Sequence, residues 1–95
     1  MKACKVDRNQ PEIVAALRSI GAVVRHVHII KGFYDILVLY RGKSYHVEIK
    51  DGLLPESKKK LTPMEKQCKA EFESVGVKYW VIDSIEEALE MLEIK

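Results

Sequence analysis

The sequence has 95 residues, of which 47% are hydrophobic and 32% are charged, and its net charge is +2. This composition is typical of one globular domain with a buried core, and it excludes a disordered chain. No apolar stretch approaches the roughly 18 residues of a membrane helix, and two cysteines make no disulfide framework, so we expect a cytoplasmic protein with reduced thiols and no membrane partner.

The first predicted helix follows a polar segment, residues 1–8, that we expect to be frayed. Asn9 has the chemistry of an N-cap, Pro11 falls in the first turn, and Glu12 stands three residues after the cap, as in a capping box. Apolar residues then recur at helical spacing. The pattern predicts a helix over about residues 10–20.

Three β-type segments come next. Residues 22–30 are rich in β-branched side chains, and residues 33–40 are almost continuously apolar, as in a central strand that is covered on both faces. The third segment is residues 44–50. Residues 51–61 then form a loop that is longer than a simple connection requires, and such loops are often functional or mobile.

The second half of the chain alternates helix, strand and helix. Residues 62–65 (TPME) form a capping box with proline at the first helical position. Gly76 ends that helix, residues 77–82 read as a fourth strand, and residues 84–87 (SIEE) open a last helix. This order predicts an α/β fold, a mixed central sheet flanked by helices on both faces.

An acidic residue interrupts the apolar second strand. Burial of Asp35 there would cost several kcal/mol unless a partner or a metal compensates it. A two-residue turn at Arg41 and Gly42 would place Asp35 opposite Glu48, whereas a turn at Gly42 and Lys43 would place it opposite Lys50. In both registers all three side chains share one face of the sheet, because side chains alternate with a period of two. A three-residue bulged loop would break this relation.

Two carboxylates on neighbouring strands can reach one cation. Mg²⁺ takes a few carboxylate oxygens and keeps several waters, so Asp35 and Glu48 together with a substrate phosphate would make a plausible site. Lys50 could orient or deprotonate a water, or neutralise charge that develops on a phosphate. The alternative is a cross-strand ion pair on an exposed face, worth about 0–1 kcal/mol.

The order of these motifs resembles the PD-(D/E)XK nuclease superfamily and, more narrowly, the small stand-alone VRR-NUC proteins of phages and bacteria. The resemblance extends from residue 9 to about residue 90, and its matching segments are residues 9–13, 32–38, 47–52, 60–63 and 81–89. It implies a restriction-endonuclease-like αβββαβ core with an extra C-terminal helix, in a single VRR-NUC-like nuclease domain over residues 1–95.

The chain departs from the family pattern at two positions. Tyr34 stands where the family usually has proline, immediately before the catalytic aspartate. Glu65 stands where the family often has glutamine, in the helix after the Leu-(Ser/Thr)-Pro element. Neither position is expected to ligate a metal, but the change at Glu65 puts any contact that depends on the amide in doubt.

The resemblance also assigns roles to individual residues. Asp35 and Glu48 would ligate Mg²⁺ or Mn²⁺ with the backbone carbonyl of Ile49, and Lys50 would serve the attacking water. Glu12 would be a third, helix-borne carboxylate that acts directly or through water. Because Glu12 also fits a capping box, both interpretations of that residue stay open.

The resemblance implies DNA as the partner. The basic run Lys58, Lys59 and Lys60 could contact DNA phosphates, although such a run is usually a solvated loop. Stand-alone members of the family are associated with cutting branched DNA as homodimers. A structure-specific endonuclease similar to a Holliday junction resolvase is therefore expected. The alternatives are a nickase, flap or end-processing nuclease, or a non-catalytic DNA-binding module on the same fold.

Overall fold

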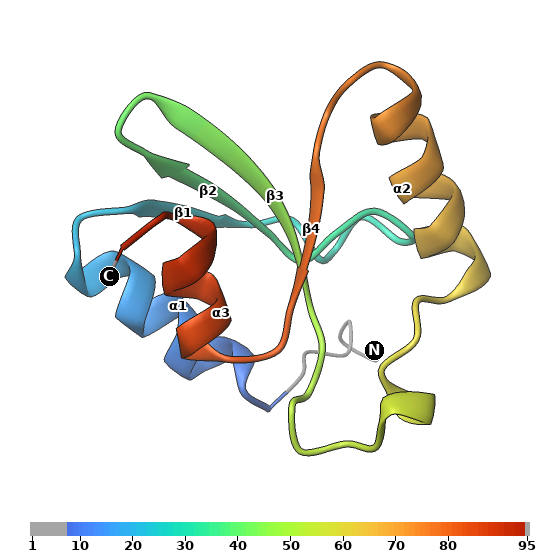
Figure 1. Ribbon diagram of the computed structural model, residues 1–95, viewed down its shortest axis with the longest axis horizontal. Coiled ribbons are helices and arrows are strands. Elements are labelled where there is room, and N and C mark those ends of the chain that lie inside the picture. Colours follow the sequence, from blue (N-terminus) through green and yellow to red (C-terminus); the bar gives the residue numbers. More distant parts are fainter. Residues whose placement is uncertain (1–7, 95) are drawn as a thin grey trace.

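The computed structural model describes residues 8–94 and contains helices on both sides of one sheet (Figure 1). In chain order the elements are α1 (Gln10–Ser19), β1 (Val23–His26), β2 (Ile36–Tyr40), β3 (Lys43–Ile49), the 3₁₀ helix η1 (Glu56–Lys58), α2 (Pro63–Ser74), β4 (Tyr79–Ile82) and α3 (Ile85–Met91). This order confirms the predicted fold class. Apart from Arg8, the segment that was expected to fray lies outside the described residues.

The sheet is mixed, as predicted, with the strand order β1-β2-β3-β4. The first two pairings are antiparallel, and β4 joins β3 in parallel. Parallel neighbours require a long crossover connection. Here the loop after β3 and helix α2 supply that crossover.

Helices α1 and α3 lie side by side against one face of the sheet, and α2 lies on the other side (Figure 1). The face toward α1 and α3 holds the larger core, which is built from apolar side chains of all four strands and both helices: Ile13, Val14, Leu17, Ala22, Val24, Ile36, Val38, Tyr45, Val47, Ile49, Ile82, Ala88, Met91 and Leu92. The face toward α2 holds a smaller cluster of Tyr34, Cys68 and Tyr79, with partly buried neighbours that include Leu37 and Phe72.

Helix α2 covers its face of the sheet thinly. Cys68 is its only buried residue, and Phe72 is partly buried. The helical spacing of Met64, Cys68, Phe72 and Val75 in the sequence predicts one apolar stripe, but Met64 and Val75 are 51% and 75% exposed. The prediction was wrong for these two residues, because the stripe continues past the short stretch where α2 meets the sheet.

The first two strands are shorter than predicted. β1 ends at His26 and β2 begins only at Ile36. The segment between them turns back on itself, with the N–H of Ile30 donating to the carbonyl of Val27 at 3.0 Å and Gly32 in the left-handed region at φ 72°. Asp35 therefore precedes the regular part of β2 and lies at the end of the sheet.

The hairpin between β2 and β3 closes through a two-residue turn at Arg41 and Gly42. Their φ angles are +48° and +79°, the combination that a type I′ turn requires, and Tyr40 pairs with Lys43. This confirms the first of the two predicted registers. The turn at Gly42 and Lys43 and the bulged loop are both wrong.

The predicted caps differ in outcome. Thr62 and Glu65 form a complete capping box at α2. At α3 the Ser84 hydroxyl accepts from the N–H of Glu87, but the Glu87 carboxylate accepts from the N–H of Asp83, so only half of the predicted box forms. Within residues 8–94, no helix is long and apolar enough to cross a membrane.

Candidate active site

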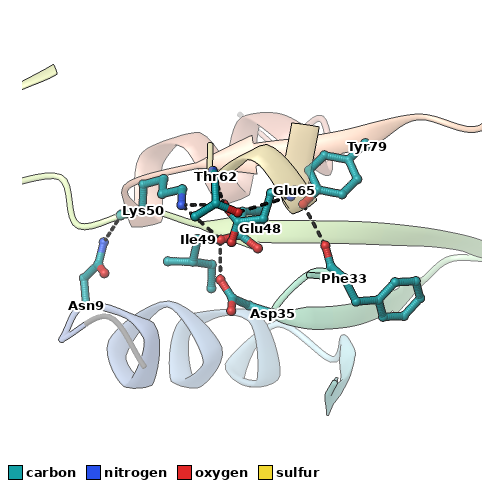
Figure 2. A network of polar contacts seen from close by, with 9 residues as sticks. All are labelled: Asn9, Phe33, Asp35, Glu48, Ile49, Lys50, Thr62, Glu65 and Tyr79. Carbon is teal, nitrogen blue, oxygen red and sulfur yellow. Dashed lines mark hydrogen bonds and ion pairs between the residues drawn. The ribbon is translucent and has the colours of Figure 1, made fainter. Parts of the chain in front are cut away.

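Asp35 lies just before β2, at the end of the sheet where the pairing of β2 with β3 stops, and its carboxylate is hydrogen-bonded to β3 (Figure 2). Its backbone N–H donates to the carbonyl of Val47 at 3.0 Å, and its carboxylate Oδ2 accepts the N–H of Ile49 at 2.8 Å. The carboxylate thus takes the place of a backbone acceptor where the regular part of β2 has not yet begun. A hydrogen bond from a backbone N–H to a charged acceptor is among the stronger kinds. Asp35 is consequently held against the peptide of Ile49.

Glu48 lies on the same face of the sheet, on the neighbouring strand. The residue is 5% exposed, and its Oε2 is 3.3 Å from the Nζ of Lys50. Burial, followed by the negative charges of Asp35 and Glu65, raises the pKa of Glu48, and the positive charge of Lys50 offsets only part of this, so that the pKa is about 9. Glu48 is therefore a buried carboxyl that would ionise readily only if a positive charge came close in addition to that of Lys50.

Lys50 reaches two carboxylates with one ammonium group. Its Nζ lies 3.3 Å from Glu48 Oε2 and 3.0 Å from Glu65 Oε1. Burial lowers the pKa of Lys50, but the hydrogen bond to Glu65 and the charges of both glutamates outweigh it, so the pKa is raised overall. Lys50 is thus cationic at neutral pH, which favours a charge-neutralising or water-orienting role over removal of a proton.

Glu65 is the residue of this cluster that was not among the predicted site residues. Its Oε1 accepts both the N–H of Thr62 and the Nζ of Lys50, each at 3.0 Å. Burial raises the pKa of Glu65, but these two donors lower it more, and the pKa is lowered overall. Two features of the sequence drew attention to Glu65: its place in a capping box, and its occurrence where the family pattern often has glutamine. Neither revealed that the carboxylate would reach Lys50 from the other end of the 51–61 loop.

A cavity of about 420 Å³ opens beside these groups. Its lining consists of Asp35, Glu48 and Glu65 together with residues 28–34, the connection between β1 and β2. The carboxylates are accordingly accessible to a ligand from the end of the sheet, although Glu48 itself is buried.

Glu12 is not brought to this cavity. It is exposed and lines a separate cavity of about 620 Å³ at the start of α1, with Asp51 and Asp83. The predicted capping box is wrong, because the Asn9 side chain makes no cap and instead donates to the carbonyls of Lys50 and Asp83 at 3.0 and 2.9 Å.

The residue of the first turn of α1 that points into the protein is Gln10. It is 1% exposed, and its Nε2 lies 3.4 Å from Nδ1 of His26. The sequence carried no clear signal for Gln10, since a polar residue at a helix start is ordinarily exposed. A ligand role for Glu12 stays a prediction, and its position gives no support for direct coordination beside Asp35 and Glu48.

The predicted DNA-binding lysines fall in and after η1. Lys59 forms ion pairs within the protein, with its Nζ 3.0 Å from both Asp83 Oδ2 and Glu56 Oε1. Lys60 is exposed, and the side chain of Lys58 lies outside what the structure describes. Of the two lysines whose side chains the structure describes, Lys60 is the exposed one.

The donor set at the open end of the sheet suits a hard divalent cation. Among the residues that the structure describes, no group of three or more His, Cys, Asp or Glu side chains is arranged to hold a metal ion. Asp35 and Glu48 supply two carboxylates, and the resemblance adds the carbonyl of Ile49. Mg²⁺ usually keeps several waters and takes one or two carboxylates plus substrate phosphate, so this smaller oxygen set fits Mg²⁺ or Mn²⁺.

Comparison with known proteins agrees with this geometry. No family model and no curated protein matches the sequence. A solved structure described as "VRR_NUC domain" superposes with a TM-score of 0.67 and 26% identity, covering 90% of this chain and 91% of that chain. The chain therefore resembles a VRR-NUC domain over nearly its whole length. Its fold is that of the PD-(D/E)XK nucleases.

Both departures from the family pattern have a structural counterpart in this chain. The ring of Tyr34 is buried in an aromatic cluster, with centroids 5.3 Å from His46 and 5.8 Å from Phe72, a volume that proline would leave unfilled. Glu65 brings a full negative charge to Lys50, where glutamine would bring only an amide dipole. The candidate site thus holds Asp35, Glu48 and Lys50 together with a third carboxylate, that of Glu65.

Proposed function

We propose that the protein is a divalent-metal-dependent DNA endonuclease that hydrolyses phosphodiester bonds and selects its substrate by structure. One observation carries the proposal. Asp35 and Glu48 lie together at the open end of the sheet beside a cavity, with the ammonium of Lys50 3.3 Å from the Glu48 carboxylate. An ion pair between Glu48 and Lys50 without a function would need neither the carboxylate of Asp35 nor the adjoining cavity.

The metal would be held by the carboxylates of Asp35 and Glu48, with the carbonyl of Ile49 as a further ligand. Bound there, Mg²⁺ or Mn²⁺ would supply Lewis-acid stabilisation to the charge on a phosphate. Asp35 is oriented for this by the N–H of Ile49. Glu48 must lose a proton to bind a cation, so metal binding at neutral pH should release protons.

Lys50 would orient the attacking water and stabilise the negative charge that grows on the phosphate in the transition state. Glu65 supports Lys50 in that position, since its carboxylate is a second partner of the ammonium, 3.0 Å away. Because Glu65 is itself held by the N–H of Thr62, Lys50 is tied to the start of α2. The positive charge of Lys50 would therefore be in position before the reaction begins.

DNA is the proposed substrate, and the preference for branched DNA and the homodimeric assembly rest on the resemblance to stand-alone VRR-NUC proteins. Two sites in a homodimer would cut paired strands, as resolution of a four-way junction requires. Lys60 would contact phosphates near the cut, and such contacts add affinity without reading sequence.

Cleavage of a panel of DNA substrates tests the proposal. Four-way junctions, flaps, nicked duplexes and linear duplexes are incubated with and without Mg²⁺ or Mn²⁺. Asp35→Asn and Lys50→Ala should abolish cleavage while circular dichroism shows that the fold persists. Lys43→Ala is the matched control, because Lys43 lies on the same strand and is exposed, 3.8 Å from the exposed Glu93. Undiminished cleavage by a folded Asp35→Asn or Lys50→Ala variant would exclude the proposed roles.

The same panel separates the alternatives. Preference for flaps or ends over junctions would identify a nickase or end-processing nuclease. Salt-dependent DNA binding without cleavage at any metal concentration would identify a non-catalytic module. Sedimentation of the protein alone and with a junction measures whether it acts as the proposed dimer.

A further inference from the structure

The connection between β1 and β2 places apolar side chains at the mouth of the candidate active site. We call residues 28–34 the rim loop. They line the same 420 Å³ cavity as Asp35, Glu48 and Glu65. At the tip of the loop Ile29 is 77% exposed and Ile30 is 53% exposed. Single exposed apolar residues are ordinary, but two adjacent ones on the wall of a polar cavity are less so.

The rim loop is braced rather than loosely attached. At its base the N–H of Val27 donates to the carbonyl of Asp35 at 2.9 Å, and further along the Tyr79 hydroxyl donates to the carbonyl of Phe33 at 2.8 Å (Figure 2).

Gly32 adds a third support to the loop. A Cβ atom at Gly32 would lie 2.6 Å from Cε and 2.9 Å from Cβ of Met64, so the backbone of the loop is seated closely against the first turn of α2. Figure 1 shows this connection reaching α2. The two isoleucines are thus presented from a fixed support.

The chemistry of the cavity determines which part of a substrate meets the isoleucines. If the carboxylates and Lys50 take the scissile phosphate, the groups next along that strand are deoxyribose and base. A base offers an apolar face, whereas a phosphate would gain nothing from Ile29 or Ile30. Lys31 follows them and is exposed, so the loop presents a cation beside its apolar tip, as binding to a polyanion requires. A strand of nucleic acid therefore fits the rim better than an apolar protein surface does.

We propose that Ile29 and Ile30 form a wedge that inserts beside the base next to the scissile phosphate and holds it out of the stack. This inference rests on the proposed function and names its substrate class, which is DNA whose stacking is interrupted, or easily interrupted, at the cut. Proteins use isoleucine, leucine and similar side chains in this way to separate base steps. The cost of unstacking is smallest at mismatched or already unpaired bases, which makes the wedge a selector of structure.

A pair of variants with matched exposure tests the wedge. The Ile29→Ala/Ile30→Ala variant removes it, and the control Val75→Ala/Val23→Ala removes side chains of nearly equal exposure, 75% and 52%, outside the cavity. Each protein is given two DNAs of one sequence, one fully paired across the mapped cut and one mismatched there. 2-Aminopurine beside the cut reports unstacking when the protein binds in Ca²⁺.

The wedge predicts a selective loss. The isoleucine variant should cleave the paired DNA at least about tenfold more slowly than the parent and the mismatched DNA within about twofold, and it should lose the fluorescence rise. An Ile29→Met/Ile30→Met variant should restore both, because methionine also serves as an apolar wedge. The control variant should behave as the parent does.

Equal loss on both DNAs, or loss on neither, would overturn the wedge. A change in sedimentation without a change in selectivity would also overturn it, because the rim would then be a contact between copies of the chain. If the parent cleaves nothing, the proposed function fails, and the mismatch and the 2-aminopurine are then set at the centre of the duplex, where the fluorescence still decides the wedge. A rise in the parent that is absent from the isoleucine variant supports it, and no difference between the two rejects it.

Discussion

The two faces of the sheet are built from the same strands but are covered very differently. On the face toward α1 and α3 two helices close over an apolar core in which Leu17, Ile36 and Val47 are fully buried. On the face toward α2 a single helix contributes one buried residue, Cys68. There the strands carry aromatic side chains and, at the open end, the carboxyl of Glu48.

This difference teaches where a small domain can keep charged groups. Full burial of an uncompensated carboxylate would cost too much free energy, whereas a fully solvated carboxylate would keep its ordinary pKa. The thinly covered face provides an intermediate setting, in which Glu48 is desolvated but still has Lys50 within 3.3 Å and a cavity nearby. The well-covered face supplies the stability that makes this tolerable.

The largest effect is expected from a core substitution on the face that α1 and α3 cover. Leu17 is completely buried in the larger core, so Leu17→Ala should lower the free energy of unfolding by about 2–5 kcal/mol. Urea denaturation followed by circular dichroism measures the loss. Cleavage per folded molecule should stay unchanged at low temperature. A smaller loss than with surface substitutions would mean that this face is not the main source of stability.

The second prediction concerns Glu48 and pH. Its folded-state pKa of about 9 exceeds the ordinary value of 4.5, so its contribution to metal-free stability is fully present below about pH 4.5 and is lost as the pH rises toward 9. Glu48→Gln removes this loss. In EDTA at pH 8 the variant should exceed the parent by more than about 1 kcal/mol, and the difference should shrink near pH 4. Thermal unfolding across pH measures it, and a destabilised variant at pH 8 would contradict the assignment.

The third prediction sharpens the role of the single helix on the polar face. Glu65→Ala removes both the cap at Thr62 and the partner of Lys50, and it should cost about 1 kcal/mol and slow cleavage. Glu65→Gln keeps an oxygen acceptor and should retain most of the stability and the rate. Lys69→Ala is a suitable control, because Lys69 pairs on the same helix with Glu73 away from the cavity. Equal behaviour of the alanine and glutamine variants would mean that the contact with Lys50 does not matter.

The smallest effect is expected at Glu12. It is exposed and lies outside the cavity of Asp35 and Glu48, so Glu12→Gln should change stability by no more than about 0.5 kcal/mol. Cleavage should remain within about twofold of the parent. A large loss of cleavage in a folded variant would instead restore Glu12 to the metal site.

The sequence predicted the order of elements and most of the hairpin because those features depend on local patterns. Alternation along β2 and β3 is enough to place Asp35, Glu48 and Lys50 on one face, and only the turn had to be decided. The positive φ of Arg41 settled it, and a non-glycine residue there gives little warning of that conformation.

Contacts between distant segments were harder to foresee. The commitment of Lys59 to Asp83, the hydrogen bonds of Asn9 to two strand ends and the contact of Glu65 with Lys50 all join residues 15 or more positions apart. In each case the local sequence allowed another role: a solvated side chain for Lys59, an N-cap for Asn9 and a capping box for Glu65. Packing of the helices against the sheet decided among these options, and no local pattern encodes it.

The ion pair between Lys50 and Glu65 also closes a ring. The segment that leaves the site at Lys50 returns to it 15 residues later at Glu65, with both ends anchored by the sheet and by the cap of α2. Doubling the length of such a segment costs only about 0.6 kcal/mol in closure entropy. Residues 53–57, the exposed middle of this segment, are therefore a natural insertion point. A designed variant can carry a longer segment there while the contacts at its two ends stay in place.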